Sequence, residues 1–110
     1  MKGAGFALLL MLGSGLAAAQ GAVPAEPAGK ALFKSRCGMC HQTIGMAVGL
    51  LARRPGDTSK GFLEDRNDLS ATFVRTAVRT GIINMPRMAR GEITDAELAA
   101  IADYLAKGRP

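Results

Sequence analysis

The stretch Cys37-Gly38-Met39-Cys40-His41 places two cysteines three positions apart, with a histidine directly after the second. With this spacing, both thiols can add across the two vinyl groups of one haem while the adjacent imidazole lies below the iron. His41 is the only histidine among the 110 residues, so three uncommon residues coincide at one place. The stretch predicts that Cys37 and Cys40 become covalent links to a haem c and that His41 is its proximal iron ligand.

Other uses of two nearby cysteines agree less well with the rest of the chain. A thioredoxin-like redox pair lies in a βαβ context, and the sequence shows no strand pattern. A zinc site needs four ligands, whereas Cys37, Cys40 and His41 supply three and nothing nearby offers a fourth. A disulfide across so short a loop removes too little chain entropy to stabilise a small domain. An incidental surface pair would leave the long loop that follows without a reason to be ordered.

The N-terminal residues have the composition of a secretory signal peptide. Lys2 supplies a positive start, residues 6–12 form a short apolar run, and Ala17-Ala18-Ala19 offers small residues to a signal peptidase. The run is too short to span a bilayer comfortably, and no basic stop-transfer flank follows it. We therefore expect residues 1–19 to be removed, a periplasmic location and no stable membrane span afterwards. An uncleaved anchor is the alternative.

The rest of the chain suits one small domain. Residues 20–27 lack periodicity and predict a flexible mature N-terminus, and residues 28–107 predict the folded domain. A core of this size usually needs a disulfide, a metal or a large cofactor to supplement it. The net charge is +5, but the basic residues are scattered along the sequence, which does not indicate nucleic-acid binding.

Apolar spacing predicts an all-α domain of about three main helices, with loops around one haem. Gly29, Phe33 and Cys37 recur every four residues and predict a first helix that begins near Pro27 and ends with the cysteine motif. Residues 42–67 show no sustained period and contain a Pro-Gly turn signal. We expect them to form a long loop whose inner side packs on the cofactor.

Two further helices have clear boundary signals. Ser70 can cap a helix that runs to about Thr80 and ends at Gly81, and Thr94 with Glu97 forms a capping box for the last helix. The predicted apolar faces are Phe73, Val74, Ala77 and Val78 in the first of these helices and Leu98, Ile101, Ala102 and Leu105 in the second. Arg75 and Arg79 lie opposite the first face, and Tyr104 flanks the second.

An electron-carrying haem iron needs a second axial ligand, since an open position would bind small molecules instead. Of the six methionines, two leave with the signal peptide and one lies inside the cysteine motif, which leaves Met46, Met85 and Met88. Met85 is preferred, because Asn84-Met85-Pro86 lies in a Gly- and Pro-bounded loop between two helices, a suitable place for a rigid ligand. Met88 is the alternate, and its other role would be to fill a gap in the core.

From about residue 28 to residue 107 the chain resembles the small monohaem class I cytochromes c of bacterial periplasms. Gly29, Phe33 and Cys37 are spaced as in the family's first helix, and Ile101 with Tyr104 resembles the last helix, which crosses the first. Gly29 has a steric reason to be there, since two helices cross closely only where a side chain is missing. The resemblance implies the class I cytochrome c fold.

The same resemblance extends to the candidate iron ligands and their supports. Val78-Arg79-Thr80-Gly81 followed by Met85-Pro86 resembles the family's approach to its sixth ligand, which favours Met85. Residues 51–54 resemble a loop whose arginine meets a haem propionate, which implies Arg54, with Arg53 as alternate. Relatives commonly carry a proline whose carbonyl accepts the Nδ1 proton of the haem histidine. Gly49 occupies that position here, so its carbonyl is the implied acceptor from His41.

Within this family, the short loop and the Val-Arg-x-Gly to Met-Pro pattern are similar to cytochrome subunits of flavin-containing alkylphenol dehydrogenases of the p-cresol methylhydroxylase type. The resemblance implies an electron carrier and not an enzyme. Its donor would be a periplasmic flavin or quinone dehydrogenase, and its acceptor an oxidase or another cytochrome. Two other hypotheses stay open: a haem enzyme or gas-binding protein with an open sixth position, and a structural subunit held permanently in a dehydrogenase complex.

Overall fold

The computed structural model describes residues 26–53 and 58–108, and within these ranges all regular secondary structure is helical. The α-helices are α1 (Ala28–His41), α2 (Met46–Ala52), α3 (Ala71–Thr80) and α4 (Asp95–Ala106), and the 3-10 helices are η1 (Thr58–Gly61) and η2 (Leu63–Asp65). An isolated bridge joins Ile82 and Met85 in the described part, which holds no strand. The prediction of an all-α domain is confirmed.

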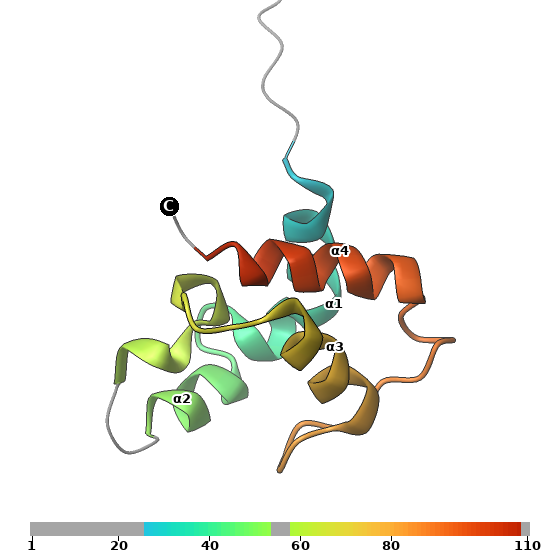
Figure 1. Cartoon of the computed structure of the whole chain (residues 1–110). Coiled ribbons are helices and arrows are strands. Elements are labelled where there is room, and N and C mark those ends of the chain that lie inside the picture. The colour runs from blue at the N-terminus through green and yellow to red at the C-terminus, as the bar shows by residue number, and fades with distance from the viewer. Residues whose placement is uncertain (1–25, 54–57, 109–110) are drawn as a thin grey trace, which may run out of the picture.

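The terminal helices of the domain cross each other. In Figure 1, α4 runs across α1, α3 packs beneath α4, and α2 lies beside α1 at the lower edge. A Cβ atom on Gly29 would lie 2.3 Å from the carbonyl oxygen of Ala100 and 2.6 Å from Cβ of Tyr104. Only a residue without a side chain permits this approach, so the steric role predicted for Gly29 is confirmed.

Helix α1 begins after Pro27 and buries Gly29 and Phe33, as its spacing predicts. Helices α3 and α4 begin at the predicted caps. The Ser70 hydroxyl accepts from the backbone N–H of Phe73, and the capping box of Thr94 and Glu97 is complete. Such caps satisfy N–H groups that have no partner within the helix.

The core lies between α1, α3 and α4. Its buried members are Phe33, Leu69, Val74, Val78, Ile93, Leu98, Ile101, Ala102 and Leu105. All four residues predicted to be buried by α4 are present in it. In α3, Val74 and Val78 are buried, whereas Phe73 at the edge of the predicted face is 49 % exposed.

Residues 42–67 differ from the long irregular loop that we expected. The described part of this segment contains α2, η1 and η2. Helix α2 has seven residues, none of them buried, and no side chain caps its first turn. A helix without a buried face or a side-chain cap leaves no periodic pattern in the sequence, which explains why it was not predicted.

Three expectations fall partly or wholly outside the described residues. The signal peptide of residues 1–19 lies outside them, and so does Arg54. Of the predicted flexible N-terminus, residues 20–27, only the last two positions are described. None of the helices in the described part is long and apolar enough to span a membrane.

Candidate functional site

The cysteine motif occupies the last turns of α1. Both cysteines are free thiols, and Cys37 is half-buried whereas Cys40 is exposed. Burial raises the pKa of Cys37 to about 11, and the negative charge of Cys40 is a smaller cause of the same shift. The two side chains therefore lie on one helical turn in different environments, with the outer one open to a reaction partner.

His41 ends α1, directly after Cys40. Burial lowers the pKa of His41 below its ordinary value, which favours the neutral imidazole that can bind a metal. Its ring lies 6.4 Å from the ring of Phe33, between centroids. Nδ1 of His41 is buried and has no hydrogen-bond partner in the structure. A buried polar atom of this kind requires a partner, and the bond predicted from Nδ1 to the carbonyl of Gly49 is not formed here.

Gly49 lies in α2, where a Cβ atom would meet nothing within 4 Å. Its role as acceptor from His41 stays a prediction. Arg53 is exposed at the C-terminal end of α2, where it is the C-cap residue. Arg54, our first choice for a propionate partner, lies outside the described residues.

Met85 and Met88 lie in the segment that connects α3 to α4. Gly81, the C-cap of α3, has a φ of +76°, a conformation that favours glycine. Two residues later, Ile83 has a φ of +52°. Ile82 and Met85 then exchange two backbone hydrogen bonds of 2.9 and 3.0 Å, which close a tight turn. Both methionine side chains are partly buried and pack against the core.

Several large apolar side chains are exposed on the elements that carry these residues. Met46 is 71 % exposed and Ile83 is 82 % exposed, and Leu50 and Ile82 are exposed to a smaller degree. Two thiols, an imidazole with a buried Nδ1, methionine sulfurs and apolar surface are the donor set and the environment that a haem c requires. The residues present therefore fit this cofactor.

Among residues 26–53 and 58–108, no group of three or more His, Cys, Asp or Glu side chains is arranged to hold a metal ion. Cys37, Cys40 and His41 are thus not arranged as three ligands of one tetrahedral centre.

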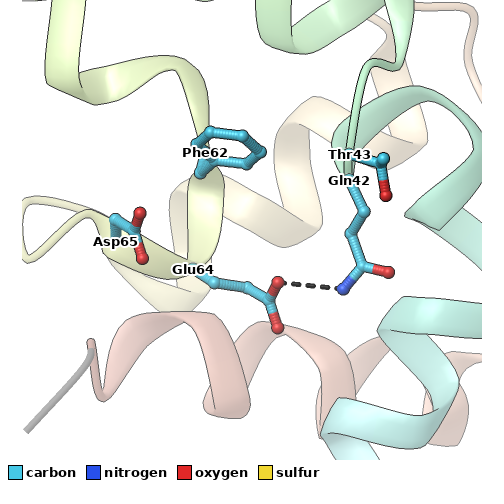
Figure 2. A pocket seen from close by; sticks show the side chains of 5 residues that line it. All are labelled: Gln42, Thr43, Phe62, Glu64 and Asp65. Atoms are coloured by element: carbon cyan, nitrogen blue, oxygen red, sulfur yellow. Dashed lines mark hydrogen bonds between the residues drawn. The ribbon is translucent and has the colours of Figure 1, made fainter.

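A pocket of about 400 Å³ opens directly after the motif and is lined by Gln42, Thr43, Phe62, Glu64 and Asp65. Figure 2 shows Phe62 and Glu64 on one side of it and Gln42 with Thr43 on the other. Nε2 of Gln42 donates to Oε2 of Glu64 over 2.9 Å, which links the residue after His41 to η2. No sequence motif indicated this contact, because its partners are 22 residues apart.

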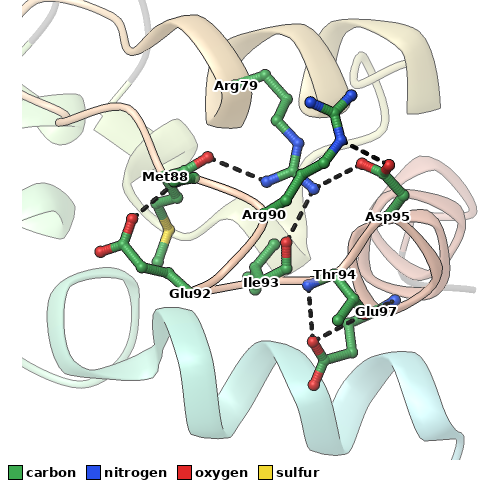
Figure 3. A network of polar contacts seen from close by, with 9 residues as sticks. Arg79, Met88, Arg90, Glu92, Ile93, Thr94, Asp95 and Glu97 are labelled. Carbon is green, nitrogen blue, oxygen red and sulfur yellow. Dashed lines mark hydrogen bonds and ion pairs between the residues drawn. The ribbon is translucent and has the colours of Figure 1, made fainter.

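Arg79 is a second residue whose role was not predicted. We expected it on the exposed face of α3, yet its side chain is only 19 % exposed. Figure 3 shows its guanidinium among backbone acceptors of the segment between α3 and α4 and the side chain of Asp95, which begins α4. Nη1 donates to the carbonyl of Met88, and Nη2 donates to the carbonyl of Ile93 and to Asp95.

Comparison with known proteins gives a family match and a similar solved structure. Residues 24–105 match the family described as cytochrome c oxidase, cbb3-type, subunit III. A chain in the crystal structure of p-cresol methylhydroxylase with substrate bound is similar, with a TM-score of 0.51 and 27 % sequence identity over 74 % of this chain and 93 % of that one. No curated protein sequence is significantly similar.

The family match covers most of the chain and includes the cysteine motif, His41 and both candidate methionines. Membership of a cytochrome c family implies a covalently bound haem c and a role in electron transfer rather than catalysis. The chain therefore belongs to the cytochrome c family described as cbb3-type cytochrome c oxidase subunit III.

Proposed function

We propose that this protein is an exported electron carrier with one haem c, attached through Cys37 and Cys40 and ligated axially by His41 and Met85. Met88 is the alternate ligand. The observation that supports this best is the end of α1, where two free thiols lie beside an imidazole whose pKa is lowered by burial. Bound haem would supply one-electron chemistry between Fe(II) and Fe(III).

The chain's own residues would set the properties of that centre. His41 would bind through Nε2, and its buried Nδ1 would donate to a carbonyl, for which Gly49 is our candidate. A thioether ligand such as Met85 raises the reduction potential relative to a second histidine. Arg54, or Arg53 in its place, would meet a haem propionate through charge-assisted hydrogen bonds.

We further propose a flavin-dependent dehydrogenase of a small aromatic substrate as the electron donor, and an oxidase or another cytochrome as the acceptor. The similarity to a chain in the p-cresol methylhydroxylase structure supports a donor of this class. Export to the periplasm is supported by the N-terminal sequence. N-terminal sequencing of the mature protein would place the cleavage site, which we expect near Ala19.

Absorbance of the ferric protein tests the ligands. We expect a methionine-to-iron band near the red end of the spectrum that is lost in M85A and kept in M88A. The two residues are matched, since both are partly buried methionines of the same connecting segment. An unchanged band in M85A would show that the ligand assignment is wrong, and absence of the band from the unaltered protein would favour an open sixth position.

Purification of the untagged native protein tests the donor. We expect a flavoprotein dehydrogenase to accompany it in a stoichiometric complex or to reduce it rapidly after separation. A haem protein that neither associates with such an enzyme nor accepts its electrons would contradict the proposed donor, while leaving the assignment as an electron carrier intact.

A further inference from the structure

The segment that carries both candidate methionines leaves α3 and returns to it. It departs where the backbone N–H of Gly81 donates to the carbonyl of Ala77 over 2.8 Å. It returns where the N–H of Met88 donates to the carbonyl of Val78, also over 2.8 Å. Residues 81–88 therefore form a closed loop with both ends bonded to the last turns of α3. Met85 is one of the residues of this loop.

Arg79 adds a side-chain anchor at the returning end of this loop. Nη1 of Arg79 donates to the carbonyl of Met88 over 3.0 Å, so both backbone groups of Met88 are bonded to α3. Nη2 donates to the carbonyl of Ile93 over 2.9 Å and to Oδ1 of Asp95 over 2.8 Å. Figure 3 shows the guanidinium between these acceptors. The side chain of Arg79 thus connects α3 to the end of the loop, to the segment that follows it and to the start of α4.

The environment of Arg79 differs from that of an ordinary surface arginine. Its side chain is 19 % exposed, whereas that of Arg75, one turn earlier on the same helix, is 43 % exposed. Arg75 makes an ion pair of 3.7 Å with Asp103. Two of the three acceptors of Arg79 are backbone carbonyls, and hydrogen bonds from a charged donor to partly buried acceptors contribute more than exposed ion pairs.

From this geometry we propose that Arg79 is a positioning residue that holds the loop of residues 81–88 in the conformation that presents the methionine ligand. The proposal rests on the proposed function, because it assumes that a methionine of this loop binds the iron. A rigid loop keeps a weak thioether ligand bound, since a loop that opens readily exposes the iron to competing ligands. Arg79 acts through the backbone of Met88 and Ile93 and touches no reacting atom.

Binding of imidazole to the ferric protein measures how readily the methionine leaves. In R79Q we expect imidazole to bind about ten-fold more tightly than in the unaltered protein, which corresponds to the loss of one hydrogen bond from a charged donor. The methionine band should also disappear at a lower guanidinium concentration than the helical circular dichroism. R79K should fall between the two proteins, because an ammonium group cannot reach all three acceptors at once.

Three controls separate positioning from general stability. R75Q removes a matched arginine of the same helix, D95N keeps both carbonyl bonds of Arg79, and S70A weakens α3 at its far end. Imidazole affinity should stay within about two-fold of the unaltered protein in all three. An R79Q protein with unaltered affinity, or equal increases in R79Q and S70A, would overturn the proposal. Absence of the methionine band before any substitution would instead overturn the ligand assignment.

Discussion

The phenol of Tyr104 on α4 donates a 2.5 Å hydrogen bond to Oε1 of Glu64 in η2, forty residues earlier in the chain. The other oxygen of the same carboxylate accepts from Gln42, the residue after His41. The ring of Tyr104 also lies 6.3 Å from that of Phe33, between centroids. Glu64 therefore connects the last helix to the end of the first, next to the candidate iron ligand.

Loss of the Tyr104 hydroxyl should destabilise the fold without repacking it. We expect Y104F to lower the free energy of unfolding of the haem-bearing protein by about 1 to 2 kcal/mol, because the ring stays in place while Glu64 loses a donor. Guanidinium unfolding would measure the change. In the background of E64A, the same substitution should have little effect, and fully additive losses would show that the two side chains do not interact.

A methyl group at position 29 should separate α1 from α4. In G29A the new Cβ would lie 2.3 Å from the backbone oxygen of Ala100, which cannot move aside as a flexible side chain would. We expect a loss of about 1 to 3 kcal/mol in the free energy of unfolding. At Gly91, a Cβ would meet nothing within 4 Å, so G91A should change that free energy by less than about 0.5 kcal/mol.

Two substitutions at opposite ends of α3 should have different consequences. G81A forces a positive φ on alanine and places Cβ 2.9 Å from the carbonyl oxygen of Met85, so we expect both lower stability, by about 1 to 3 kcal/mol, and a weakened methionine band. S70A removes the N-cap and should cost about 1 kcal/mol while the band stays intact. Equal effects on the band would contradict a special role for the loop.

Acid should destabilise the protein partly through Glu97. Its pKa is lowered to about 2, first by the backbone N–H of Thr94 and then by hydrogen bonds from Arg36 and the Thr94 hydroxyl. Because the folded pKa lies below the unfolded one, this stabilisation is present above about pH 4.5 and is lost as the pH falls toward 2.

Glutamine at position 97 tests this pH dependence, because it can still serve in the capping box but does not titrate. Acid titration of E97Q should show a smaller loss of stability between pH 4.5 and 2 than the unaltered protein. Some loss should remain, since Arg66 lowers the pKa of Asp68 to about 2 as well. Identical acid profiles for E97Q and the unaltered protein would contradict the expectation.

The sequence was sufficient to predict the elements that are defined by interactions between residues close together in the chain. Ser70 and Gly81 bound α3 as predicted, and the Thr94–Glu97 capping box starts α4, because a cap needs only residues three positions apart. Gly29 could be interpreted as a crossing point from its place in the first helix and the family resemblance. The cysteine motif likewise depends on five consecutive residues.

Features that depend on distant contacts could not be predicted. Periodicity placed Arg79 on the polar face of α3, but its acceptors belong to residues 88–95, whose conformation is set by tertiary packing. The bond between Tyr104 and Glu64 depends on η2, a short 3-10 helix that contains Glu64 and has no periodic signal in the sequence. The assignments of Gly49 and of the propionate arginine stay predictions for a related reason, since backbone carbonyls and loop arginines have no distinctive sequence pattern.

The crossing of α1 and α4 has a consequence for how the chain folds. Gly29 meets Ala100 and Tyr104 across most of the domain's length, so the contact forms only after a long segment has closed on itself. Each helix then buries apolar residues in the core that it shares with α3, so fraying of one exposes part of the surface that the other covers. We therefore expect a change that loosens one end of the domain to weaken the packing of the other end as well.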